Sequence, residues 1–161
     1  MTADGEQAPS VLVWFEDSPE GRCALTEASV LARRRSVCLT VVAVAALERV
    51  IGCGRCLQGT VLWNIELQKI AREELLEARS ALDDPADASY EVLVGDPAEM
   101  ITQAAERLGA DVIVLPALKT RRFGPPNRRN VSGRVAARGP WHVIVASRQL
   151  ALSDPLPACT D

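Results

Sequence analysis

The stretch that decides the fold covers residues 90–115 and reads YEVLVGDPAEMITQAAERLGADVIVL. It begins with a short apolar run of strand-forming residues, and Asp96 followed by Pro97 is a typical helix start. Apolar residues then recur at helical spacing until Gly109, a residue type that commonly ends helices. A second apolar run, Val112 to Leu115, follows at once. This order predicts a strand, a helix and a second strand, the repeating unit of a parallel sheet.

The same alternation continues on both sides of this stretch. Further strands are predicted at 11–15, 37–45 and 143–146, and Ser18 before Pro19 predicts the start of the first helix. The other predicted elements are a long helix over 60–82, a turn at 83–88, a basic loop over 116–129 and a short helix over 130–138. Strands that are apolar on both faces and alternate with helices predict a doubly wound, Rossmann-like α/β fold, with a five-stranded parallel sheet and helices on both faces.

The long predicted helix carries one apolar stripe, which we expect to face the sheet. Its members recur at steps of three and four residues: Trp63, Leu67, Ala71, Leu75, Ala78 and Leu82. Trp14 and Trp63 both lie on apolar stretches, so we expect each to be a core or an interface residue.

The chain of 161 residues has room for one domain. We expect that domain over residues 10–149, after a disordered segment at 1–9 and before an irregular tail at 150–161. No apolar run is long enough to span a membrane, so no membrane partner is expected. Residues 1–9 are polar and acidic, unlike a signal peptide, which predicts a cytoplasmic protein.

Charge is distributed unevenly along the chain. The net charge is −3, but residues 112–153 carry eight basic side chains and no acidic one. The bulk charge argues against a general nucleic-acid binder, and an aromatic content of 4% argues against a base-stacking surface. The basic region predicts attraction of a small anion, or packing against an acidic surface of this chain or of a protein partner.

Three stretches of the chain together resemble the universal stress protein family. They are Val11-Leu12-Val13 with Ser18-Pro19-Glu20 and Ala24-Leu25; Gly95 to Glu99 with Ile101, Ala104-Ala105 and Ala110 to Val114; and Ser132, Arg134-Val135, Pro140 and Val143 to Val145. The resemblance covers about residues 10–147. It implies the strand order 3-2-1-4-5, a homodimer and a role in the stress response, and it implies ATP binding in many members.

The resemblance also implies where a nucleotide would bind. The family uses an Asp after the first strand, a Val at the end of the second, and a loop Gly-x-x-Gly-x9-Gly-Ser/Thr after the fourth. In this chain those places fall on Glu16, Val44, Pro116, Lys119, Arg129 and Asn130. The spacing of the loop survives but its glycines do not. Pro116 has no amide hydrogen to donate, and the side chains of Lys119 and Arg129 fill the space that phosphates need.

We therefore expect a stress-response protein that binds no cofactor, and in particular no ATP in the family's manner. The alternative is a nucleotide-binding module that holds ATP or AMP through an altered, basic loop, with weak ATP hydrolysis. The basic side chains could also bind a small anion such as phosphate. The favoured interpretation is that these side chains form a solvated rim, or that they pair with acids such as Glu16, Asp17 and Asp96.

Two further motifs do not indicate catalysis. Cys53 and Cys56 form a CxxC, but the other residues of a zinc site lie far away in sequence, so neither a metal nor an obligatory disulfide is expected. A redox or metal sensor is the weaker alternative. His142 opens the last strand with no nucleophile near it in sequence, which favours a packing role. We therefore do not expect an enzyme.

The strand at Val143 to Ala146 should lie at an edge of the sheet in the order 3-2-1-4-5. Four apolar residues are a poor choice for an open edge, because unpaired strands associate with other chains. The sequence therefore predicts a homodimer in which this strand pairs with its symmetry mate.

Overall fold

The computed structural model describes residues 9–46, 56–84, 87–117 and 130–146. Its elements are β1 (Ser10–Trp14), α1 (Pro19–Arg35), β2 (Cys38–Ala45), α2 (Cys56–Ala81), β3 (Ala88–Val94), α3 (Pro97–Leu108), β4 (Ala110–Pro116), α4 (Val131–Ala136) and β5 (His142–Ala146). All neighbouring strands are parallel, in the order β3-β2-β1-β4-β5. The predicted fold class and strand order are both confirmed.

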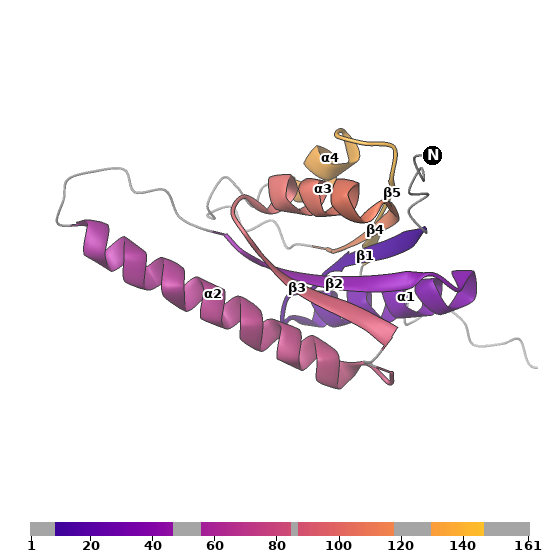
Figure 1. Cartoon of the computed structure of the whole chain (residues 1–161), viewed down its shortest axis with the longest axis horizontal. Helices are drawn as coiled ribbons and strands as arrows, with labels where there is room; N and C mark the ends of the chain where they lie inside the picture. The colour runs from indigo at the N-terminus through magenta and orange to yellow at the C-terminus, as the bar shows by residue number, and fades with distance from the viewer. Residues whose placement is uncertain (1–8, 47–55, 85–86, 118–129, 147–161) are drawn as a thin grey trace, which may run out of the picture.

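Helices cover both faces of the sheet, and successive residues of each strand alternate between two cores. On β1, Val11 and Val13 belong to the core shared with α1 and α2, whereas Leu12 and Trp14 belong to the core shared with α3 and α4. Figure 1 shows α3 and α4 on one side of the sheet and α1 and α2 on the other. Strands β2 and β3 follow β1 on one side of the sheet, whereas β4 and β5 lie on the other side, so the strand order changes direction between β1 and β4. A fold of this kind commonly binds ligands at such a point.

The predicted helix starts form as the sequence indicates. Ser18 caps α1 by accepting a hydrogen bond from the Gly21 amide (3.0 Å), and Asp96 caps α3 by accepting one from the Glu99 amide (3.1 Å). Gly109 ends α3 in the left-handed conformation, with φ of 61°. Ser18 and Asp96 thus fix the helix starts at the carboxyl edge of the sheet, and Gly109 fixes the end of α3 at the amino edge, just before β4.

Helix α2 departs from the prediction at its N-terminal end. It starts at Cys56, four residues before the predicted start at Thr60. Ala71 and Ala78 are buried against the sheet as expected, but Trp63 is 48% exposed and is not a core residue of the described chain. The reason is visible in Figure 1, where the first part of α2 runs out past the end of the sheet. None of the described helices is long and apolar enough to cross a membrane.

Candidate functional site

The segments singled out in the sequence meet at the carboxyl edge of the sheet. Glu16 follows β1, Gly95 follows β3 and Pro116 ends β4, and parallel strands bring these ends to one edge. Backbone hydrogen bonds continue beyond the strands there. The Phe15 amide donates to the Val42 carbonyl (2.8 Å), and the Gly95 amide donates to the Ala45 carbonyl (3.0 Å). The segments that leave this edge are therefore held in place at their first residues.

Glu16 lies in a tight turn between β1 and α1. Its side chain is half-buried with Oε1 out of contact with solvent, and its carbonyl oxygen accepts a hydrogen bond from the Ser18 amide (2.8 Å). Gly21, in the first turn of α1, packs directly on this peptide. A Cβ atom at position 21 would lie 2.0 Å from the Glu16 carbonyl oxygen. Glycine is thus required at position 21 for the observed placement of Glu16.

A side chain from α2 reaches the same turn. The Asp17 amide donates to Glu74 Oε1 (3.4 Å), and the Asp17 carboxylate pairs with Arg22 Nη2 (2.9 Å). Sequence reasoning did not single out Glu74. Its signal is its spacing, because it lies three residues after Ala71 and four before Ala78 on the face that packs against the sheet.

Val44 is a buried side chain of β2 and pairs in register with Leu93 of β3. It belongs to the core shared with α3 and α4, in which Trp14 and Ile101 are also buried. In this structure Val44 therefore serves as a core residue at the carboxyl edge.

The residues at the end of β4 have no backbone N–H group available for a ligand. Pro116 is buried in register with Ala146 of β5 and has no amide hydrogen. The next amide, that of Ala117, donates to the Ala146 carbonyl (3.0 Å). Proline is tolerated here because the described ladder between β1 and β4 already ends at the pair Val13 and Val114. The two residues that follow Leu115 therefore offer no free backbone N–H to a ligand.

Of the other loop positions, Lys119 and Arg129 lie outside the described residues, whereas Asn130 is described. Asn130 adopts the left-handed conformation, with φ of 51°, and its Oδ1 accepts a hydrogen bond from the Gly133 amide (3.2 Å). The residue in the family's Ser/Thr place thus serves as the N-cap of α4.

An ion pair joins α4 to the start of α3. Arg134 donates from Nη2 to Asp96 Oδ2 (2.8 Å) and from Nη1 to Asp96 Oδ1 (3.2 Å). Burial raises the pKa of the Asp96 carboxyl. Hydrogen bonds from Arg134 and from the Glu99 amide, together with the charges of Arg134 and Arg138, outweigh that effect and hold the pKa below its usual value. For Arg134, the expected pairing with an acid at a strand end is therefore observed.

The remaining candidates lie elsewhere. His142 is exposed at the start of β5, at the opposite end of that strand from the candidate site. Cys53 lies outside the described residues, and Cys56 is the first residue of α2. Within the described ranges, no group of three or more His, Cys, Asp or Glu side chains is arranged to hold a metal ion.

The strand order and the two helical layers define a doubly wound, Rossmann-like α/β protein. The model of the Universal stress protein family matches residues 9–147. The chain belongs to that family, and the recognition from sequence is confirmed.

Solved universal stress proteins share the fold over most of their length. The Archaeoglobus fulgidus protein, solved in complex with dAMP, is 24% identical with a TM-score of 0.58 over 86% of this chain and 97% of its own. UspA from Lactobacillus plantarum is 21% identical with a TM-score of 0.65, over 86% and 97%. A family protein from Burkholderia pseudomallei is 19% identical with a TM-score of 0.65, over 88% and 97%. No curated protein matched the chain.

Proposed function

We propose that this universal stress protein is a non-catalytic, regulatory member of its family that does not bind ATP in the family's manner. The exit from β4 is the observation that carries the proposal. Pro116 offers no amide hydrogen and the Ala117 amide is bonded to Ala146, so the first two donors of a phosphate loop are lost. A phosphate oxygen placed there would meet no backbone donor in exchange for its lost hydration.

Helix α4, which follows the loop, supports the same conclusion. The Gly133 amide is bonded to Asn130, and Arg134 is bonded to Asp96 through both of its terminal nitrogens. A nucleotide phosphate would have to displace these internal contacts to recruit either donor. Because the Asn130 and Asp96 oxygens would then lose their donors, part of the gain from the new contacts is offset, and the exchange does not favour ATP.

Calorimetry with ATP at about 0.15 M salt tests this proposal. We expect no binding in the low-micromolar range for the unmodified protein. Pro116→Gly, Lys119→Gly and Arg129→Gly combined should raise ATP affinity, because they return an amide hydrogen and space for phosphate. Low-micromolar ATP binding by the unmodified protein would refute the proposal.

A second candidate is a site for a nucleoside monophosphate. Glu16 and Val44 stand at the adenine end of the family site, and the Archaeoglobus fulgidus relative was solved with dAMP. A thermal-shift series with ATP, ADP, AMP and inorganic phosphate separates the two candidates. A ligand at 100 times its dissociation constant adds about 2.7 kcal/mol of stability. A shift with AMP that exceeds the shift with phosphate would favour this second function.

We also propose that β5 mediates a homodimer. It is the last strand of the sheet and pairs only with β4 within the described chain. Val145 is 46% exposed, and Val143 and Ile144 are half-buried. An apolar edge strand of this kind is covered when it pairs with its symmetry mate.

A further inference from the structure

Strand β5 directs the backbone groups of alternate residues toward the outer edge of the described sheet. The Ala146 carbonyl accepts a hydrogen bond from the Ala117 amide, which follows β4, so Ala146 turns its backbone groups toward β4. The direction of these groups alternates along a strand. Val143 and Val145 therefore turn their N–H and C=O groups away from β4, toward any strand that pairs with β5.

These outward groups select one register for the pairing of two copies. In the homodimer proposed above, on which this inference rests, the two β5 strands are antiparallel about a twofold axis. With the axis beside Ile144, Val143 of each copy lies opposite Val145 of the other, and each such pair exchanges two hydrogen bonds. An axis beside Val143 or Val145 would leave the other valine opposite a residue outside β5. We therefore expect the register centred on Ile144.

This register brings His142 of each copy to the carboxyl end of the other copy's β5. His142 then lies opposite Ala146 in a non-hydrogen-bonded pair, with the two Cα atoms about 4.5 Å apart. Alternate residues of a strand share a face, and Ile144 and Ala146 contact the core shared with α1 and α2. The partner's His142 therefore lies on the α1 face of the sheet, beside the strand end that is in register with Pro116.

One flank of α1 faces the same region and carries two acids. At about 100° per residue around the helix axis, Arg33 lies to one side of the buried stripe, and Glu20 and Glu27 lie to the other. The Arg33 side faces α2, because Arg33 Nη1 is 3.8 Å from Asp83 Oδ2 just after that helix. Helix α1 also contacts β4 and β5, so the acidic flank formed by Glu20 and Glu27 is turned toward β5. Both of these side chains are half-buried.

We propose that the partner's His142 pairs with the acidic flank of α1, so that each copy contributes a basic residue to the carboxyl edge of the other. An imidazolium beside Glu20 or Glu27 gains a charge-assisted hydrogen bond. The twofold axis repeats the contact, so two such pairs form in each dimer. His142 is remote from the candidate site of its own chain, and it reaches the corresponding site of the partner through the antiparallel pairing of β5.

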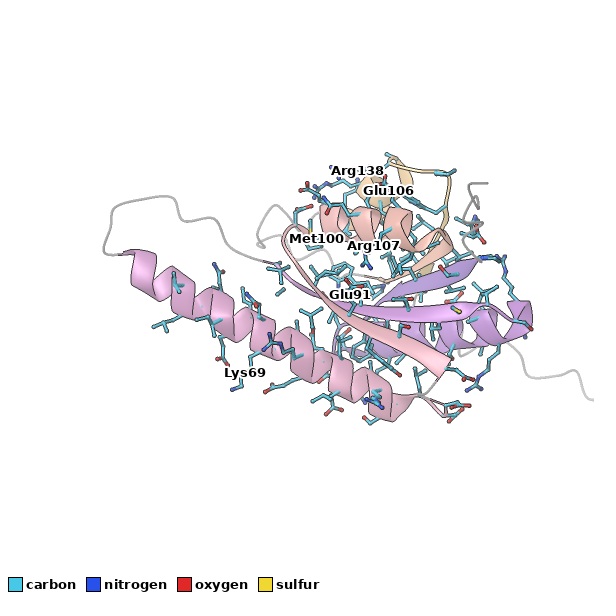
Figure 2. The ribbon with its side chains drawn as sticks, in the orientation of Figure 1. Lys69, Glu91, Met100, Glu106, Arg107 and Arg138 are labelled. Atoms are coloured by element: carbon cyan, nitrogen blue, oxygen red, sulfur yellow. The ribbon has the colours of Figure 1, made fainter. Side chains whose placement is uncertain are left out.

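The other charged and titratable groups near this position leave the acidic flank dominant. In the described chain, Cys23 and Arg34 also lie on this side of α1. Cys23 is half-buried against the core, and Arg34 lies about 10 Å further along the helix than Glu27, toward the amino edge of the sheet. Arg138 precedes β5, but Figure 2 shows it near α3 and α4, on the face of the sheet opposite α1. The partner's His142 therefore meets mainly carboxylates.

The chain contains one histidine, which gives the proposal a direct readout. Histidine side chains gain a proton between about pH 8 and pH 5, a range in which exposed carboxylates remain ionised. Association should therefore tighten as the pH falls from about 8 to about 6. From two pairs per dimer, we expect the dissociation constant of the dimer to fall about tenfold, measured by light scattering against concentration.

Substitutions assign the effect to the proposed pair. His142→Gln should abolish the pH dependence, and His142→Arg should keep association tight at both pH values because its charge does not titrate. Glu20→Gln with Glu27→Gln should also abolish the pH dependence. Glu106→Gln is the matched control, because Glu106 is an exposed acid of α3, on the opposite face of the sheet, and it should leave the dependence unchanged. A pH dependence that persists in His142→Gln would overturn the proposal.

Cross-linking tests the register independently of charge. His142→Cys combined with Ala146→Cys places two thiols opposite one another between copies, at a Cα separation that a disulfide spans. With oxidised glutathione, the double variant should form far more covalent dimer than either single variant or the unmodified protein. A double variant that is not cross-linked, although the reduced protein is still a dimer in light scattering, would overturn this inference and leave the homodimer standing. A monomer in the same measurement would refute the homodimer and this inference with it.

Discussion

Gly21 shows how one residue positions another. The turn that holds Glu16 exists because the first turn of α1 has no side chain at this point. Gly21→Ala should reduce the free energy of unfolding by about 1–3 kcal/mol, since a Cβ atom would overlap backbone atoms that have little room to move. Urea unfolding followed by circular dichroism measures the loss. An unchanged midpoint would mean that the turn relaxes freely.

Gly59 provides the opposite case. It lies in α2, and a Cβ atom there would have no neighbour within 4 Å. Gly59→Ala should therefore stabilise the protein by about 0.5–1 kcal/mol, because alanine loses less backbone entropy in a helix. The same urea experiment checks this, and a decrease in stability would show that this part of α2 is not helical in solution.

At the scale of residues, helix N-caps could be predicted from the sequence, whereas contacts between distant elements could not. Ser18 and Asp96 could be identified as N-caps because capping depends on neighbours within three residues. The spacing of Glu74 places it on the face of α2 toward the sheet, but no local pattern identifies Asp17, 57 residues away in the chain, as its partner. The engagement of Ala117 with β5 likewise depends on tertiary pairing.

Among the elements, α4 is a helix of six residues whose position depends on its link to α3. Arg134→Met should reduce stability at neutral pH by about 1 kcal/mol, because the Asp96 side chain is only 23% exposed while the Arg134 side chain is 36% exposed. Arg22→Met is the control, since its pair with Asp17 is more exposed. We expect an effect below about 0.5 kcal/mol for the control.

The same ion pair predicts a pH dependence. The folded pKa of Asp96 lies below its value in the unfolded chain, so the stabilisation is present at neutral pH and is lost as the pH falls through the folded pKa. The difference in stability between the unmodified protein and Arg134→Met should therefore shrink in increasingly acid solution. A difference that stays constant with pH would show that Asp96 does not provide it.

The order and type of the elements could be predicted because periodicity and caps agree along most of the chain. The start of α2 could not, because Gly54 and Gly59 weaken the helical signal on both sides of Cys56. The exposure of Trp63 could not be predicted from the sequence either. Its spacing places it on the buried stripe, but only the tertiary structure shows that the sheet ends before it.

At the scale of the whole molecule, β5 is the edge strand of the described sheet. Val145→Arg should weaken association through this edge and lower the particle mass in light scattering, because a charged side chain would be buried in the paired strands. Val30→Arg on α1 is the matched control, with a similar exposed fraction. Equal masses for the two variants would argue against pairing through β5.

The strand order also places β5 at one end of the sheet and the α2–β3 side at the other. In the proposed pairing through β5, the sheets of two copies would join into one continuous sheet of ten strands, with β3 of each copy at its far ends. Such a contact is closed, because each copy has one β5 edge and uses it once. The expected particle is therefore a dimer of fixed size, and growth into a polymer would require a contact at another surface.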